Sequence, residues 1–499
     1  MNNPIMRLNK HLVAFVAFRM LGAFFVRTYF VPDEYWQSLE IAYRSVFGYG
    51  YETWEWRRGI RSYLYPTMFA IFYRVIDFFG LSRSYFSMTM GPKLFQSAIC
   101  GYGDYGLYVA SRNAFGPKAA KWTAALQLTS WLVFFMSSRT LTNTAEMCLL
   151  GMGLKYFPWR EPEKLSAGYM FFAALSFCIR PTSAVLWLPF LIYHFLMSHR
   201  KADIFATAGF IGFMVIGIST ALDTHMSGRT VFTMWEFVKV NFFEAVGDHY
   251  GSLPWHWYLS IGLPTALSFH VLPFVFAILQ TLRKSSVGSD KWPVIASIVL
   301  YVAMLSVVSH KEHRFLAPVM PLINMLGGLW LADSLEKRKS KEEKPRKTAW
   351  ILAGLFLANF PIAIFCGTMH QYAPIQVMRF LHDYVGDGPK LDSSGILFLT
   401  PCHSTPFYSH LLRNVPMQFL TCEPQQSPDE ADRFFADPLN AIDLYPVEKF
   451  SHVVIFDSLL EILTRKYFAD RKFTVCAKFF HSFFPDARRG RELFVLCRK

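Results

Sequence analysis

Two adjacent carboxylates, Asp33 and Glu34, follow the first long apolar run of the chain. Pro32 suits the first position of a helix, because it lacks an N–H that would stay unbonded there, so both acids are expected in a first helical turn. If that helix continues, Asp33, Gln37 and Glu40 share one polar face at positions i, i+4 and i+7. A carboxylate held in this way can act as a general acid or base, or it can only complement the helix dipole.

A second polar segment, residues 309–315 with the sequence Ser-His-Lys-Glu-His-Arg-Phe, lies between two apolar runs. Lysine offers a point charge, and arginine offers a planar fork that can hold a phosphate with two bonds. Charges against a bilayer need an anion, so the segment predicts an anion site in which Glu312 orients the basic side chains. The alternative is a basic patch that holds lipid head groups. The potentially cationic residues are His310, Lys311, His313 and Arg314.

Aromatic and charged side chains alternate in residues 51–62, and aromatic side chains gather again around one histidine in residues 250–264. Such a loop is costly to expose without a partner, which favours a binding role. The alternative is an aromatic belt at the surface of a membrane.

The composition explains which elements must position these residues. Of 499 residues, 53% are hydrophobic and 17% are charged, and the mean hydropathy is +0.24. A soluble protein of this size could hardly keep fifty Phe and thirteen Trp off its surface. The net charge of +14 does not indicate nucleic acid, because the basic residues lie in short connectors between apolar runs, which is the positive-inside pattern.

We expect an α-helical polytopic membrane protein with about 11 to 13 transmembrane helices, since a regular span needs about 17 to 25 apolar residues. Several runs are shorter, which favours broken or tilted helices around a cavity. Arg19 would lie near mid-membrane and must be paired or led to water. A short piece at residues 102–115 is a candidate extra span. The runs lie at roughly residues 11–30, 63–80, 84–101, 119–138, 143–157, 166–180, 181–197, 204–221, 257–282, 292–309, 315–334 and 349–367.

Basic connectors at residues 198–201, 283–284 and 336–347 are expected on the cytosolic side. Counting spans from them places the acids, the cationic segment and the C-terminal tail on the opposite side. Two non-cytosolic loops follow, residues 31–62 and 222–256. The number of spans places the N-terminus in the cytosol if residues 102–115 cross the membrane.

The composition changes after residue 370, where Pro, Asp, Ser and His rise. We therefore expect a membrane domain of residues 1–370 and a small non-cytosolic α/β domain of residues 371–499. Strand-like pieces lie at residues 396–399, 453–456, 473–476 and 493–496, and a helix-like piece lies at residues 458–468.

Cys100, Cys148, Cys178 and Cys366 lie in apolar runs and are expected to be small core residues. In an oxidising compartment the other four cysteines allow two disulfides with three connectivities. These are Cys402, Cys422, Cys476 and Cys497.

Residues 32–40, 53–62, 250–264 and 310–315 resemble the dolichol-phosphate-mannose-dependent mannosyltransferases of the GT-C superfamily. The match spans nearly the whole chain. Residues 401–410 resemble the branch of that family that acts on glycosylphosphatidylinositol (GPI) anchors.

The resemblance implies a GT-C fold and an inverting transfer of mannose from dolichyl-phosphate-mannose. The acceptor would be the second mannose of a GPI-anchor precursor, and the new α-1,2 linkage would add the third mannose. It also implies a multi-pass protein of the endoplasmic reticulum membrane with a lumenal active site and a lumenal C-terminal domain. The expected partners are the donor, the GPI-precursor glycolipid and membrane lipids, and no nucleic acid.

An inverting transfer needs one carboxylate to take the proton of the attacking hydroxyl, and no second acid because the phosphate leaves ionised. Asp33 is the expected base and Glu34 the alternative. Lys311 and Arg314, helped by the two neighbouring histidines, would hold the leaving phosphate. Arg139 is a further candidate there, with an interfacial arginine as the equal alternative. The candidate substrate contacts are Gln37, Glu40, Trp54, Trp56, Arg61, Trp255, His256 and Trp257.

No cofactor is expected and no metal is required. Cys402, His403 and His410 could suggest zinc, but no second ligand pair has the expected spacing. Two other functions stay open: transfer to another mannose position on GPI or on the dolichol-linked oligosaccharide, and, more distantly, a multispanning lipid or solute transporter. A transporter of repeated halves would show an internal repeat, and we find none.

Overall fold

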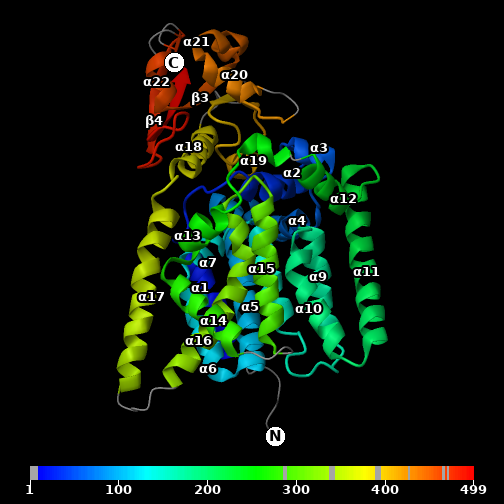
Figure 1. The fold of residues 1–499 in the computed structure, drawn as a ribbon. Coiled ribbons are helices and arrows are strands. Elements are labelled where there is room, and N and C mark those ends of the chain that lie inside the picture. Colours follow the sequence, from blue (N-terminus) through cyan, green and yellow to red (C-terminus); the bar gives the residue numbers. More distant parts are fainter. Residues whose placement is uncertain are drawn as a thin grey trace. The chain divides into compact units, whose positions relative to one another are not determined.

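The computed structural model describes residues 9–244, 246–284, 289–336, 343–387, 395–424, 428–463, 467–468 and 471–498. Most of these residues are helical, and a five-stranded sheet lies near the C-terminal end of the chain (Figure 1). The predicted class, a helical membrane protein with a small C-terminal α/β region, is confirmed.

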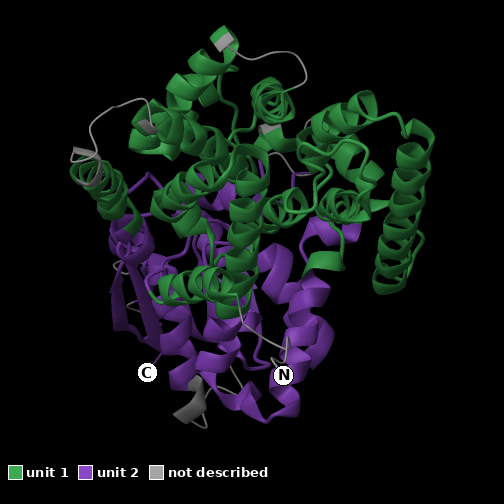
Figure 2. Cartoon of the chain, turned by 90° about the horizontal axis from the view of Figure 1, so that it is seen from below, with its two compact units in different colours: residues 1–24, 58–65, 93–363 green, residues 25–57, 66–92, 364–499 purple. Residues whose placement is uncertain are grey.

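The chain divides into two compact units (Figure 2). Unit 2 combines the C-terminal region with the segment that carries Asp33, although the two lie far apart in the sequence. The predicted boundary at residue 370 stays a prediction. Unit 1 comprises Met1–Phe24, Arg58–Tyr65 and Lys93–Ala363, and unit 2 comprises Phe25–Arg57, Pro66–Pro92 and Ile364–Lys499.

Unit 1 is built from helices. They are α1 (Lys10–Ala23), most of α5 (Tyr85–Phe115), α6 (Pro117–Thr129), α7 (Trp131–Met136), α8 (Thr142–Leu154), α9 (Ala167–Ile179), α10 (Ser183–Met197), α11 (Lys201–Ser227), α12 (Thr233–Val238), α13 (Leu263–Leu267), α14 (Val271–Lys284), α15 (Lys291–Val307), α16 (Met320–Glu336) and most of α17 (Glu343–Thr368).

Four helical segments within the described residues are long and apolar enough to cross a membrane: Lys201–Ser227, Tyr258–Arg283, His313–Leu335 and Arg346–Tyr384. Three shorter apolar helices, α9, α10 and α15, also coincide with predicted runs. The total of 11 to 13 spans stays a prediction. Helix breaks were expected and are present, for example at Ser130, whose extended backbone separates α6 from α7.

The expectation of a separate span at residues 102–115 was wrong. These residues continue the run 84–101 in one helix, α5, of 31 residues, which is about 46 Å long at 1.5 Å per residue. Hydropathy alone could not show this, because residues 102–115 are about as apolar as the preceding run, and an apolar stretch of this length can form one long helix or two spans. The side on which the N-terminus lies therefore no longer follows from the span count.

Arg19 is fully buried on α1 and is paired, as expected for an intramembrane charge. Its Nε lies 2.6 Å from Asp104 Oδ2 on α5, and its Nη2 donates to the backbone oxygen of Gln127 on α6. Gln127 Nε2 in turn donates to Asp104 Oδ1 at 2.9 Å. The Arg19–Asp104 ion pair and the side-chain amide of Gln127 thus link α1, α5 and α6.

The sheet in unit 2 has the strand order β2-β1-β3-β5-β4. β1 is parallel to both β2 and β3, whereas β5 is antiparallel to β3 and β4. The four predicted strands are confirmed, and β2 was missed because it has only three residues. The strands are β1 (Gly395–Leu399), β2 (Met417–Phe419), β3 (Phe450–Phe456), β4 (Phe473–Phe480) and β5 (Glu492–Arg498).

The remaining helices of unit 2 include α2 (Glu40–Phe47), α3 (Trp54–Arg58), α4 (Leu64–Phe78), α18 (Ala373–Asp387), α19 (Tyr408–Leu411), α20 (Glu430–Ala436), α21 (Pro438–Ala441) and α22 (Asp457–Leu463), with the ends of α3 and α4 shared with unit 1. The predicted helix 458–468 coincides with α22 in its first part, while residues 464–466 lie outside the described residues. The same holds for residues 337–342 of the predicted cytosolic loop.

The tail cysteines form two disulfides, Cys402–Cys422 and Cys476–Cys497, which selects one of the three open connectivities. Cys100, Cys148 and Cys178 are buried free thiols, as predicted, and Cys366 is half-buried.

Candidate active site

Asp33 and Glu34 begin one continuous helix of residues 33–47, which we call the acid helix. It is not a regular α-helix: Tyr35–Leu39 form a π turn, in which the N–H of Glu40 donates to the carbonyl of Tyr35. Glu34 is fully buried, whereas Asp33 is only half-buried. Of the two predicted acids, Asp33 therefore has the side chain that solvent or a substrate can reach.

The expected polar face of the acid helix is not formed, because the π turn adds a residue to the helical repeat. Gln37 instead donates to the carboxylate of Glu55 at 3.0 and 3.3 Å. Glu40 accepts from backbone N–H groups of the C-terminal region. Burial raises the pKa of Glu40 to about 7, although these hydrogen bonds oppose the shift. Glu40 is thus held within unit 2, and its proposed contact with substrate stays a prediction.

The aromatic residues after the acid helix differ in their surroundings. Trp56 is buried, and its indole N–H donates to the carbonyl of Trp36. Trp54 is half-buried. Arg61 belongs to unit 1, where its guanidinium lies over the ring of Phe237 at 5.9 Å. Trp56 therefore supports the acid helix, and Trp54 has the more accessible ring.

The cationic segment is organised by Glu312. Its carboxylate accepts from Arg314 Nε at 2.9 Å, from Arg314 Nη2 at 2.5 Å and from His310 Nε2 at 3.1 Å. Burial opposes ionisation of Glu312, but the charges and hydrogen bonds of Arg314 and His310 outweigh it and lower the pKa of this carboxyl to about 2. The same hydrogen bond with Glu312 raises the pKa of His310 despite burial. Glu312 is therefore ionised and fixes two of the four basic side chains, as the sequence predicted.

Lys311 is buried, and its ammonium donates to the backbone carbonyl of Val308. Burial lowers its pKa. An ammonium has three donors, so Lys311 keeps donors for an anion.

Two predicted segments meet in unit 1. The N–H of Leu253 donates to the carbonyl of Ser309 at 2.9 Å. The hydroxyl of Tyr258 both donates to the carbonyl of Glu312 and accepts from its N–H. The ring of Trp257 lies edge-on to His313 with centroids 4.8 Å apart. Trp257 is thus the tryptophan of this segment that supports the cationic residues.

Two other candidates in this region, Trp255 and His256, are more peripheral. Trp255 is 68% exposed, and His256 is exposed with its Nδ1 close to Ser260 Oγ. Their substrate contacts stay predictions. Arg139 is fully buried with its guanidinium 3.9 Å from the centre of the Phe135 ring.

Sequence reasoning missed Arg180, which follows α9. Its Nε lies 3.4 Å from Glu146 Oε2 on α8, and its guanidinium lies over the ring of Phe315 at 5.1 Å. Arg314 lies over the same ring at 5.2 Å. The sequence offered one indication: Arg180 lies between two apolar runs, directly before Pro181. A charged residue at membrane depth indicates a functional role.

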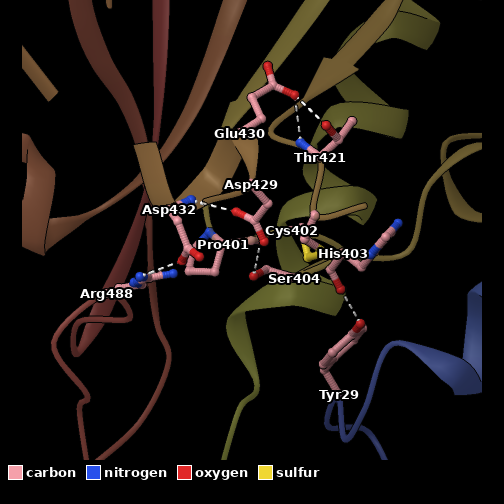
Figure 3. Close-up of a disulfide and its surroundings, with 11 residues drawn as sticks. Tyr29, Pro401, Cys402, His403, Ser404, Thr421, Asp429, Glu430, Asp432 and Arg488 are labelled. Carbon is pink, nitrogen blue, oxygen red and sulfur yellow. Dashed lines mark hydrogen bonds and ion pairs between the residues drawn. A yellow bond between two sulfur atoms is a disulfide. The ribbon is translucent and has the colours of Figure 1, made fainter. Parts of the chain in front are cut away.

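Cys402, His403 and Cys422 place their ligand atoms within 4.8 Å of one another, which is a geometry that could hold a metal (Figure 3). Metal ligation uses the thiolate, and both sulfurs belong to a disulfide. The donor set therefore does not suit a metal ion. The expectation that the reaction needs no cofactor stays a prediction.

Comparison with known proteins gives the family. Residues 11–412 match the Alg9-like mannosyltransferase family. GPI mannosyltransferase 3 of Drosophila melanogaster is 40% identical over 89% of this chain and 79% of its own length. GPI alpha-1,2-mannosyltransferase 3 is 37% identical in Danio rerio and 35% in Homo sapiens, over 98% of this chain and 89% and 87% of their lengths.

Solved structures show the same fold. ArnT from Cupriavidus metallidurans bound to undecaprenyl phosphate has a TM-score of 0.59 at 12% identity and covers 98% of both chains. The oligosaccharyltransferase AglB from Archaeoglobus fulgidus, in complex with an inhibitory peptide and a dolichol-phosphate, has a TM-score of 0.53 at 13% identity over 91% of this chain and 70% of its own. The expected GT-C fold is confirmed. The chain is a glycosyltransferase that belongs to the Alg9-like mannosyltransferase family.

Proposed function

We propose that this enzyme transfers mannose from dolichyl-phosphate-mannose to the 2-hydroxyl of the second mannose of a GPI-anchor precursor and so adds the third mannose. The observation that carries the proposal is the similarity, over 98% of the chain, to proteins named GPI alpha-1,2-mannosyltransferase 3. A polyprenyl-phosphate donor is supported by fold neighbours solved with undecaprenyl phosphate and dolichol-phosphate.

In the proposed reaction the acceptor oxygen attacks the anomeric carbon of mannose while the bond from that carbon to the phosphate oxygen breaks. The β-linked donor gives an α-linked product, so the displacement inverts. Asp33 takes the hydroxyl proton, and dolichyl phosphate leaves with the bonding electrons. The half-buried carboxylate of Asp33, beside the fully buried Glu34, supports this assignment.

The leaving phosphate is stabilised by Lys311 and Arg314, with His310 as a further donor. Their fixed positions, set by Glu312 and the Val308 carbonyl, remove the need to reorganise when charge develops on the phosphate. This arrangement supplies positive charge without a metal ion.

We place the enzyme in the endoplasmic reticulum membrane with the reaction and the C-terminal region on the lumenal side. Two disulfides in the C-terminal region support an oxidising compartment. The apolar helices support a multi-pass protein.

The test is mannose transfer by the purified protein in proteoliposomes with dolichyl-phosphate-mannose and defined acceptors. A GPI precursor with two mannoses should gain one mannose, and the same precursor lacking the 2-hydroxyl of its second mannose should gain none. Transfer to a dolichol-linked oligosaccharide instead would assign the neighbouring activity.

Asp33→Asn should lower kcat by about 10² to 10⁴, the range of general-base catalysis. Asp77→Asn, an exposed acid on α4, is the matched control and should leave kcat unchanged. Full activity of Asp33→Asn together with loss in Glu34→Gln would move the base to Glu34.

A further inference from the structure

The C-terminal region sends one loop, residues 400–411, against the acid helix within unit 2. We call this segment the tail loop. The indole N–H of Trp36 donates to the carbonyl of Thr405 at 3.0 Å. The hydroxyl of Tyr29, which precedes the acid helix, donates to the carbonyl of His403 (Figure 3). The start of the acid helix is therefore bonded to the backbone of the tail loop.

Glu40 joins the tail loop further along the acid helix. It is fully buried, and its two carboxylate oxygens accept the backbone N–H groups of Tyr408 and Ser409, each at 3.0 Å. Two hydrogen bonds, one to each carboxylate oxygen, fix the orientation of this side chain. This carboxylate therefore fixes the acid helix at a second point.

Aromatic packing fills the space between these two attachments. The ring of Trp36 lies 4.3 Å from that of His403 and 5.1 Å from that of Phe407, measured between centroids. Tyr35 lies edge-on to His410 at 5.0 Å. Burial lowers the pKa of His403 to about 4 against the opposing charge of Asp33, so its ring is neutral at physiological pH and lies within electrostatic reach of the predicted base.

The attachments bracket the π turn. Tyr35 and Trp36 begin it, and Glu40 follows its last residue. A π turn inside a helix is uncommon and is frequently found at functional sites. It is held here by contacts with the tail loop on both sides and begins two residues after Asp33.

The tail loop is itself constrained. The disulfide Cys402–Cys422 flanks His403, whose φ of +54° lies in the left-handed region. A residue other than glycine keeps that conformation only where its surroundings impose it. The hydroxyl of Ser404 donates to the carbonyl of Pro401 and closes the same turn. The loop therefore offers the acid helix a rigid surface.

We propose that the tail loop is a positioning element for the reaction: it holds the acid helix, through Trp36 and Glu40, so that the carboxylate of Asp33 stays in the orientation that removes the acceptor proton. The proposal rests on the proposed function, in which Asp33 is the base. Trp36, Glu40 and the disulfide Cys402–Cys422 act through Asp33.

The two disulfides provide a matched test. Cys402–Cys422 and Cys476–Cys497 span 20 and 21 residues, so removing either relieves the unfolded chain of nearly the same constraint. Only the first disulfide flanks the tail loop. The double variants Cys402→Ser/Cys422→Ser and Cys476→Ser/Cys497→Ser are compared with the parent protein in proteoliposomes.

The first double variant should lower kcat by about tenfold or more, with the KM for dolichyl-phosphate-mannose unchanged, because a displacement of about 1 Å at a reacting group can cost about 100-fold. The second should keep kcat within about twofold. Equal losses in both variants, or no loss in the first, would overturn the proposal. Rates are taken per folded protein, from the fraction that elutes as a single species.

Two milder single variants test the proposal even if the serine variants misfold. Trp36→Phe keeps an aromatic ring but loses the hydrogen bond to Thr405, and Glu40→Gln keeps the shape but presents an NH₂ group to one backbone N–H. Trp36→Phe should lower the plateau of kcat and leave unchanged the apparent pKa of its acid limb, which reports the base. Because burial raises the pKa of Glu40 to about 7, its own titration also shapes the acid limb, so Glu40→Gln is judged by the plateau alone, which should fall. A plateau of kcat that is unchanged in both variants would overturn the positioning role.

Asp33→Asn is measured in the same series. If Asp33→Asn is inactive and the first disulfide variant matches the second, the positioning proposal fails and the proposed function stands. If Asp33→Asn is fully active, the base assignment fails, and the positioning proposal fails with it.

Discussion

Replacing Glu312 with glutamine removes the one carboxylate that organises the cationic segment. Its pKa of about 2, against an ordinary 4.5, corresponds to about 3 kcal/mol in favour of the ionised form, since one pKa unit corresponds to about 1.4 kcal/mol. The side chain is 24% exposed, so solvent screens this energy only in part. Because the folded pKa is depressed, the contribution is present above pH 4.5 and is lost as the pH falls toward 2.

At neutral pH, Glu312→Gln should therefore lower the free energy of unfolding by about 3 kcal/mol, because buried Arg314 loses its charged partner. Arg314 and His310 also lose their orientation, so the KM for the donor should rise about tenfold, equivalent to about 1.4 kcal/mol. The measurements are chemical unfolding in detergent and transfer rates at varied donor concentration. A double-mutant cycle with Arg314→Gln should show a coupling energy of the same size.

Glu244→Gln is the matched control. Glu244 also accepts two hydrogen bonds from one arginine, Arg58, at 2.7 and 3.0 Å, but both side chains are about one-third exposed. A surface pair contributes only about 0 to 1 kcal/mol, so the control should change neither stability nor donor KM noticeably. Unchanged stability in Glu312→Gln, or a lower donor KM, would refute the reasoning, because Glu312 would then oppose the anion without orienting its ligands.

The other predictions concern the same residues and the membrane core. The donor KM should rise as the pH increases through the pKa of His310, because the hydrogen bond with Glu312 raises that pKa above the ordinary 6.5 and the imidazolium charge is lost only above the raised value; a donor KM that rises with pH in the parent and stays flat in His310→Gln would confirm this. Asp104→Asn should cost about 3 to 5 kcal/mol in unfolding experiments, because it leaves Arg19 as an unpaired buried charge. Arg180→Gln should raise the donor KM, because the guanidinium over Phe315 adds positive charge beside the proposed phosphate site. An unchanged donor KM would limit the role of Arg180 to its ion pair with Glu146.

Sequence reasoning found the features that local chemistry determines. The four longer strands could be predicted because each is a short apolar or β-branched run between polar breaks. The pairing of Arg19 could be predicted because a charge among apolar residues requires a partner. The internal order of the cationic segment followed from Glu312 lying between His310 and Arg314.

The features that sequence reasoning missed depend on contacts between distant residues. An α-helical spacing was expected from Asp33 to Glu40, but Glu40 is bonded to Tyr408 and Ser409, 368 and 369 positions away. Those bonds accompany a π turn that no local propensity indicates. Arg180 was missed for the same reason, since its relation to Phe315 exists only after α9 and the segment that follows α15 have packed together.

Charge balance explains how one segment can be both stable and ready for an anion. Glu312 neutralises Arg314 and hydrogen-bonds His310, so those side chains are held by the protein itself. Lys311 is different: it is 5% exposed and its ammonium donates to a neutral carbonyl, which leaves its charge poorly solvated and its pKa lowered. Under the proposed mechanism, the donor phosphate restores the favourable surroundings that burial removed, so donor binding and retention of the lysine proton reinforce each other. The same charge then stabilises the phosphate as it leaves, and this role suits a lysine that has no carboxylate partner among the residues that the structure describes.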